Sequence, residues 1–221
     1  MDTTTTNSAN ENNVEPGQSR KIVMKTPFTA QAVTLEELFS GSPVLNVPDF
    51  QRSYSWTTTE AGQLLDDILE AVDATPAAQD NADPNDIFLG AIVLLHNPLD
   101  QKASAPATLE GPSQSGAQPR TFEIIDGLQR LITLTTLLAV SRDLAADDPE
   151  TAAQANAAVI TSGDDEGGDA QPRLRLPGAM QKFFWTYIQK PGASAEMPES
   201  ETLSPTEERL LEVRELFLER L

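Results

Sequence analysis

The 221-residue sequence has no cysteine and only one histidine, His96. The lack of cysteine excludes a disulfide framework, cysteine-ligated zinc, iron–sulfur clusters and thiol catalysis. A single histidine excludes histidine-rich metal sites, the usual Ser-His hydrolases and a nuclease finger that needs two histidines from this chain. No apolar run approaches the roughly 20 residues that span a bilayer, and the Thr/Asn-rich start lacks the apolar core of a signal peptide. These absences predict a cytoplasmic protein without membrane contact.

Basic residues are also scarce. Fifteen lysines and arginines face 34 acidic residues, which gives a formal net charge of −19. This balance argues against a protein that simply coats nucleic acid or an anionic membrane. The charge is uneven, because residues 57–100 carry nine acids and no base, whereas residues 171–195 carry four bases and no acid. The simplest interpretation is a solvated acidic surface with one basic, aromatic segment.

The apolar pattern predicts an α/β chain of the α+β type, with a small mixed sheet and flanking helices. Three capping boxes predict helix starts: Thr34-x-x-Glu37, Thr57-x-x-Glu60 and Ser204-Pro205-x-Glu207. The other expected elements are an edge strand within 22–33, short strands at 44–47 and 122–125, a central buried strand at 87–95, a long buried helix over 128–145 and an aromatic helix over 180–189.

Composition divides the chain into four segments. They are a disordered tail over 1–20, a core over 21–145, a flexible acidic excursion with one helix over 146–170, and a helical extension over 171–221. The last helix carries an apolar stripe that stops at Leu221 without a cap. This ending favours either a longer protein with a further C-terminal domain or a homo-oligomer seam.

The strongest candidate site is the junction between the strand at 122–125 and the helix that follows it. A helix N-terminus offers unpaired backbone N–H groups and a positive dipole end, and both favour phosphate. Gly127 lets the backbone turn sharply and approach a ligand, while Asp126 is suited to holding Mg²⁺ or orienting water. Gln129 and Arg130 lie in the first helical turn, where a guanidinium binds phosphate through two hydrogen bonds. The alternative is that Asp126 only caps the helix and Arg130 is an ordinary surface side chain.

Arg52 is the second candidate, a lone cation among aromatic residues directly before a helix. Its alternative role is cation–π packing in an aromatic loop. For His96 and for the acidic cluster at 164–169, structural or solvated roles are favoured over catalysis and metal binding. The aromatic stretch 183–187 is more typical of a core than of a base-stacking platform, although its basic flanks keep nucleic-acid contact open.

Three motifs occur in order along the chain. They are Val47-Pro48-Asp49-Phe50-Gln51-Arg52-Ser53-Tyr54-Ser55-Trp56, Phe88-Leu89-Gly90-Ala91-Ile92 and Ile125-Asp126-Gly127-Leu128-Gln129-Arg130-Leu131. Together they resemble the N-terminal domain of GmrSD-type, modification-dependent restriction endonucleases, from about residue 34 to 145 and more loosely afterwards. One departure is Leu128, where the family usually has glutamine. If the family's glutamine contacts nucleotide or water, leucine at this position reduces or abolishes turnover. If that glutamine only lines the helix start, the leucine is harmless.

The resemblance implies a ParB/sulfiredoxin-like core that binds and hydrolyses a nucleoside triphosphate with Mg²⁺, within a phage-defence restriction system that senses modified DNA. A separate His-Asn-His-type nuclease domain, absent from this chain, would cut the DNA. Implied catalytic residues are Asp126 (also the Mg²⁺ ligand), Arg130 and Arg52, and implied nucleotide-binding residues are Gly127, Gln129, Gln51 and Tyr54. The chain has no Walker A motif, which excludes P-loop chemistry. The alternative is a non-catalytic module that binds nucleotide or DNA, or scaffolds a nuclease, with a degenerate signature.

Overall fold

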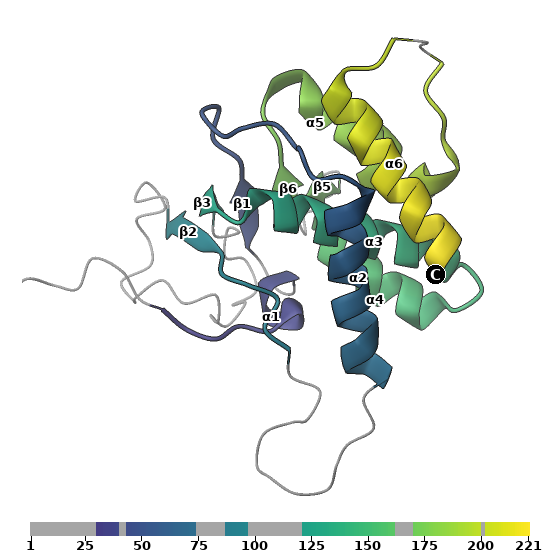
Figure 1. The fold of residues 1–221 in the computed structure, drawn as a ribbon, viewed down its shortest axis with the longest axis horizontal. Helices are drawn as coiled ribbons and strands as arrows, with labels where there is room; N and C mark the ends of the chain where they lie inside the picture. Colours follow the sequence, from purple (N-terminus) through teal and green to yellow (C-terminus); the bar gives the residue numbers. More distant parts are fainter. Residues whose placement is uncertain (1–29, 40–42, 74–86, 97–120, 162–169, 200–201) are drawn as a thin grey trace, which may run out of the picture. The chain divides into compact units, whose positions relative to one another are not determined.

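A computed structural model describes residues 30–39, 43–73, 87–96, 121–161, 170–199 and 202–221. The chain divides into the units Met1–Ala32 and Val33–Leu221. In the first unit, residues 30–32 are exposed and belong to no helix or strand. All elements below lie in the second unit (Figure 1). The predicted tail at 1–20, most of the predicted edge strand within 22–33 and the acidic cluster at 164–169 lie outside the described residues.

The sheet of the second unit is small and mixed, as the sequence predicts. Its strands are β1 (Val44–Asn46), β2 (Val93–His96), β3 (Thr121–Asp126) and β6 (Leu174–Arg175), in the order β2-β3-β1-β6. Strand β1 runs parallel to both β3 and β6, whereas β2 pairs antiparallel to β3. The carboxyl end of β3, with Asp126, leads directly into the next helix.

The prediction of a central buried strand over 87–95 is wrong. Residues 87–92 form no strand, and β2 begins only at Val93 and lies at the edge of the sheet. Val93 and Leu95 remain about half exposed, at 48% and 52%. An edge strand that is covered on one face buries only alternate side chains. The unbroken apolar run therefore predicted burial on both faces for a strand that is covered on only one.

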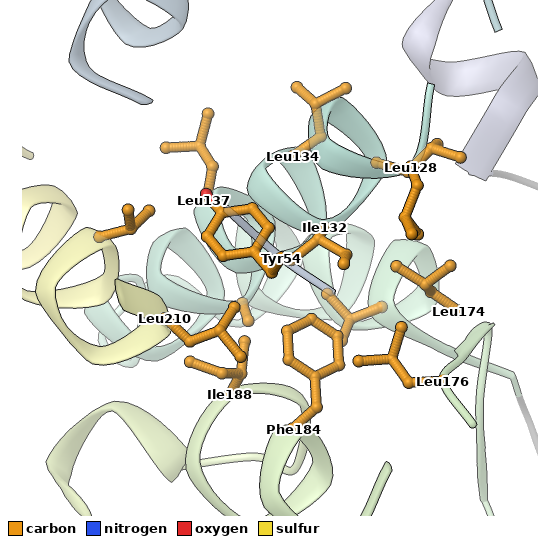
Figure 2. Close-up of a cluster of buried hydrophobic side chains, with 14 of the residues drawn as sticks. Tyr54, Leu128, Ile132, Leu134, Leu137, Leu174, Leu176, Phe184, Ile188 and Leu210 are labelled. Atoms are coloured by element: carbon orange, nitrogen blue, oxygen red, sulfur yellow. The ribbon is translucent and has the colours of Figure 1, made fainter. Parts of the chain in front are cut away.

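Helix α3 (Leu128–Leu144) forms the centre of the core, because most of its residues are buried and they lie all around the helix. Two of its buried threonines bond to the preceding turn: Thr133 Oγ1 donates to the Gln129 carbonyl and Thr136 Oγ1 to the Ile132 carbonyl, both at 2.9 Å. Figure 2 shows apolar side chains of α3 gathered with those of α5 (Gly178–Phe184), the π-helical turn Trp185–Gln189 and α6 (Pro205–Arg220). The predicted helix over 128–145 is confirmed.

The three predicted capping boxes are confirmed. Helix α1 (Leu35–Phe39) begins with reciprocal hydrogen bonds between Thr34 and Glu37. Helix α2 (Thr58–Asp73) begins with the Thr57 N–H donating to Glu60 at 2.8 Å. Helix α6 begins with the Ser204 capping box and packs against α2 and α3 (Figure 1).

The remaining elements follow α3. Helix α4 (Pro149–Val159) packs along α3 and supplies the helix expected within 146–170. It leads into the two-stranded sheet of β4 (Ile160–Thr161) and β5 (Gln171–Pro172), and a 3₁₀ turn spans Ala193–Ala195. No helix in the described part of the chain is long and apolar enough to cross a membrane.

The basic segment 171–195 is partly interior. Arg173 is 3% exposed, and its guanidinium donates to the carbonyls of Pro43 at 2.9 Å and Ala157 at 2.7 Å. Phe183 and Phe184 are also buried. The aromatic residues therefore belong to the core rather than to a base-stacking surface, and this segment exposes less positive charge than its sequence suggests.

Candidate functional site

The three sequence motifs meet around one cleft, at the point where β3 passes into α3. The loop after β1 contributes three lining residues and the β3–α3 junction contributes five: Gln51, Arg52, Trp56, Asp126, Gly127, Leu128, Gln129 and Arg130. The cleft has a volume of about 150 Å³. Segment 90–92, from the second motif, lies directly against the junction. Residues separated by up to 79 positions in the sequence thus form one site.

Two glycines allow these backbone segments to approach one another. Gly127 has φ +91°, and a Cβ there would lie 2.9 Å from Cγ1 of Ile92 and 3.3 Å from the Ala91 carbonyl oxygen. Gly90 has φ +111°, and a Cβ there would lie 2.5 Å from Cζ of Arg130. Both values of φ disfavour side chains, and the distances of 2.9 and 2.5 Å are shorter than real Cβ contacts. At Gly127 a side chain would meet backbone, whereas at Gly90 it would meet only the end of the Arg130 side chain.

Arg130 is half-buried, and its guanidinium is held from three sides. Its Cζ lies 5.9 Å from the ring centroid of Trp56, Nη1 is 3.4 Å from the Ala91 carbonyl oxygen, and the Gly90 backbone lies close behind it. The buried Nε has no hydrogen-bond partner among the described residues. A guanidinium carries five N–H donors; apart from the buried Nε and the Nη1 donor that faces Ala91, the Nη donors of Arg130 remain for an anion.

Arg52 is exposed at the cleft and forms no hydrogen bond or ion pair with any described residue. The predicted alternative of cation–π packing does not hold for it, because the cation that lies over Trp56 belongs to Arg130. The two arginines thus differ: Arg130 is fixed against its surroundings, whereas Arg52 is free to move toward a ligand.

Asp126 does not cap α3, so this alternative is wrong. The N-cap position is Gly127, with no side-chain cap, and one Asp126 carboxylate oxygen accepts the Gly127 N–H at 2.8 Å. The first helical hydrogen bond runs from the Leu131 N–H to the Gly127 carbonyl at 3.0 Å. The N–H groups of residues 128–130 precede that bond and point out of the helix start. The junction therefore combines uncapped donors with one exposed carboxylate.

Gln129 and Gln51, both predicted to bind nucleotide, make hydrogen bonds that hold the loop after β1 and strand β3. Gln129 is 6% exposed; its Oε1 accepts the Ser55 N–H at 2.7 Å and the Trp56 N–H at 3.3 Å, and its Nε2 donates to the Ser53 carbonyl at 3.2 Å. The Gln51 Nε2 donates to the carbonyls of residues 124 and 125, at 3.1 and 2.9 Å. Both side chains line the cleft, and these hydrogen bonds fix the position of its walls.

Tyr54 was predicted to contact nucleotide, but the structure places it in the core (Figure 2). It is 3% exposed, and its hydroxyl lies 2.8 Å from Thr133 Oγ1. Burial raises the pKa of Tyr54 to about 12, although the hydrogen bond with Thr133 opposes this effect. Through Thr133, Tyr54 anchors the loop to α3 from the core side of the loop. It does not line the cleft. His96 packs edge-on against Phe122, with ring centroids 5.4 Å apart, in keeping with the structural role expected for it.

The comparison with protein families shows to which family the chain belongs. The family model described as "GmrSD restriction endonuclease, N-terminal domain" matches residues 35–219. The chain belongs to this family. The GmrSD match begins with α1 and continues through α6, well beyond the stretch that carries the three motifs. No curated protein matches the chain.

Leu128, at the position where the resemblance predicts glutamine, is one of the residues that line the cleft. Leu128 is 6% exposed, and its side chain packs in the hydrophobic cluster with Ile132 (Figure 2). The substitution therefore provides no polar side chain at this edge of the cleft. The polar groups of the cleft are those of Arg52, Asp126, Arg130 and the helix start.

The cleft of this GmrSD domain suits Mg²⁺ only together with a ligand that brings its own oxygens. Within the described residues, no three His, Asp or Glu side chains gather into a metal site. Asp126 supplies one exposed carboxylate, of which one oxygen already accepts the Gly127 N–H. Mg²⁺ is commonly held by one or two carboxylates plus substrate phosphates and water. The residues present fit such a shared site and do not form an independent metal cage.

Proposed function

We propose that this GmrSD N-terminal domain binds a nucleoside triphosphate through its phosphates in the cleft, and hydrolyses it, within a modification-dependent restriction system. The observation that carries the proposal is the meeting of two guanidinium groups, those of Arg52 and Arg130, with the uncapped N-terminus of α3. Arginine and a helix N-terminus both bind phosphate, the first through paired hydrogen bonds and the second through backbone donors.

The size of the cleft supports binding of the phosphate end of the nucleotide. A volume of about 150 Å³ corresponds to about five waters at ~30 Å³ each. That space accepts a phosphate group and is smaller than the 300 Å³ or more typical of pockets that enclose a whole small molecule. In this proposal the base and sugar therefore lie outside the cleft, toward solvent.

The proposed roles follow from how firmly each side chain is held. Arg130 and the helix start are prearranged donors for charge that develops on the transferring phosphoryl group. Arg52 closes on the phosphates from the opposite wall. Asp126 orients the attacking water and is the residue that would hold Mg²⁺, which neutralises phosphate charge when bound. Sensing of modified DNA and its cleavage are assigned to a nuclease domain or partner outside these residues.

The test is a panel of nucleoside triphosphates with Mg²⁺, read by phosphate release and by thermal stabilisation. We expect Asp126→Asn to keep the stabilisation and lose release, and Arg130→Gln to lose both. A matched control is Arg209→Gln, on α6 outside the cleft, which should behave like wild type. Equal release by wild type and Asp126→Asn would remove Asp126 from the mechanism.

A second candidate function is nucleotide binding without turnover, in a module that scaffolds a nuclease. Leu128 favours it, because its buried apolar side chain replaces the glutamine usual in the family signature. Thermal stabilisation by nucleotide without phosphate release would support this function. Release above the Asp126→Asn background would exclude it.

A further inference from the structure

We infer that Gly90 is a positioning residue for the cleft: the absence of a side chain at this position is what allows the Arg130 guanidinium to lie where it can meet phosphate. The part of this inference that concerns phosphate rests on the proposed function. The part that concerns the location of Arg130 does not.

The contact is unusually close. A Cβ at Gly90 would lie 2.5 Å from Cζ, 2.6 Å from Nη2 and 2.7 Å from Nη1 of Arg130. All three atoms belong to the far end of one flexible side chain, and none belongs to backbone. An added methyl group therefore displaces the guanidinium and leaves the packing of α3 in place.

The displaced guanidinium would lose its present support. Its Nη1 faces the Ala91 carbonyl at 3.4 Å, next in the chain to Gly90, and its Cζ lies 5.9 Å from the Trp56 ring. The unpaired Nε is buried in this same arrangement. One glycine thus determines both the distance of Arg130 from Trp56 and the orientation of its free donors.

The first measurement needs no ligand. In a Trp185→Phe background, which leaves Trp56 as the single tryptophan, we expect Gly90→Ala to shift the emission of Trp56 to that of Arg130→Ala, because both variants remove the cation from the ring. The matched control is Gly192→Ala: Gly192 also has positive φ, at +77°, but no atom within 4 Å of the added Cβ. It introduces backbone strain without touching Arg130, so its Trp56 emission should match wild type.

The second measurement is the affinity for inorganic triphosphate. We expect Gly90→Ala to weaken binding about 10- to 100-fold, the range for losing a hydrogen bond to a charged group, with no effect of Gly192→Ala. In an Arg130→Ala background, adding Gly90→Ala should change affinity no further, although the strain at φ +111° persists. A purely structural glycine would weaken binding in both backgrounds.

The outcomes separate this inference from the proposed function. If Gly90→Ala leaves both Trp56 emission and triphosphate affinity at wild-type values, the inference is wrong and the proposed function is untouched. If wild type binds no triphosphate while Gly90→Ala shifts the emission, the positioning of Arg130 stands and the phosphate cleft does not. An additive loss in the double variant would overturn the positioning role.

Discussion

Replacing Gln129 with alanine should loosen the cleft and destabilise the fold together. The Gln129 amide makes four hydrogen bonds to the loop before α2: its oxygen accepts from the Ser55 N–H, the Ser55 hydroxyl and the Trp56 N–H, and its nitrogen donates to the Ser53 carbonyl. At about 1 kcal/mol for each hydrogen bond, and with the freed loop groups partly regaining water, we expect a loss of ~2–3 kcal/mol. For a chain of this size, that loss lowers Tm by about 4–12 °C.

The assay combines urea unfolding with the affinity for inorganic triphosphate. Gln181→Ala is the matched control, because the Gln181 amide also bridges two groups, the Leu176 N–H and Gln189 Oε1, but lies outside the cleft. The control should lose ~1–2 kcal/mol of unfolding free energy and keep its affinity for triphosphate. Gln129→Ala should lose both stability and affinity. A Gln129→Ala variant that stays within about 0.5 kcal/mol of wild type, the range of an ordinary surface substitution, would show that these hydrogen bonds do not stabilise the fold.

Three further predictions concern single hydrogen-bonding groups. Burial alone raises the pKa of Asp143, but hydrogen bonds from Arg142 and from two backbone N–H groups outweigh it and lower the pKa. The stability contributed by Asp143 is thus present above about pH 4 and lost as pH falls through the folded pKa, so the difference in urea unfolding between wild type and Asp143→Asn should shrink there. Tyr54→Phe should cost ~1 kcal/mol and remove an absorbance titration near pH 12, the pKa of Tyr54. Ser204→Ala should cost ~1 kcal/mol through loss of the α6 cap, measured by urea unfolding; no change would show that α6 is held by packing alone.

Local signals in the sequence were sufficient for the helix starts and for the β3–α3 junction. Capping boxes such as Thr34–Glu37 act within four residues, and the turn at Gly127 joins a strand directly to a helix. The prediction over 87–95 failed because an apolar run does not show whether a strand is central or at the edge. It is the position beside β3 that leaves Val93 and Leu95 exposed.

Side-chain roles in the site depended on contacts that no local pattern contains. Gln129 and Tyr54 lie in motifs that predict ligand contact, yet one holds a loop 74 residues away and the other is bonded to Thr133, 79 residues away. The close contact of Gly90 with Arg130 likewise joins two motifs 40 positions apart. The motifs therefore predicted which residues gather, while their division into cleft and support required the fold.

The distribution of the arginines reconciles the net charge of −19 with the anionic ligand that we propose for the cleft. Arg142, Arg173 and Arg214 are each less than 5% exposed, and their guanidinium groups donate to backbone carbonyls. These buried charges bind backbone carbonyls inside the fold and are not available on the surface to contact nucleic acid. Arg52 and Arg130 keep free donors at the cleft, and at the half-buried Arg130 the Gly90 backbone and the Trp56 ring limit screening by water. The positive charge near the proposed ligand is therefore local. The overall acidity disfavours binding of DNA along the surface, but it does not weaken binding of a phosphate group in the cleft.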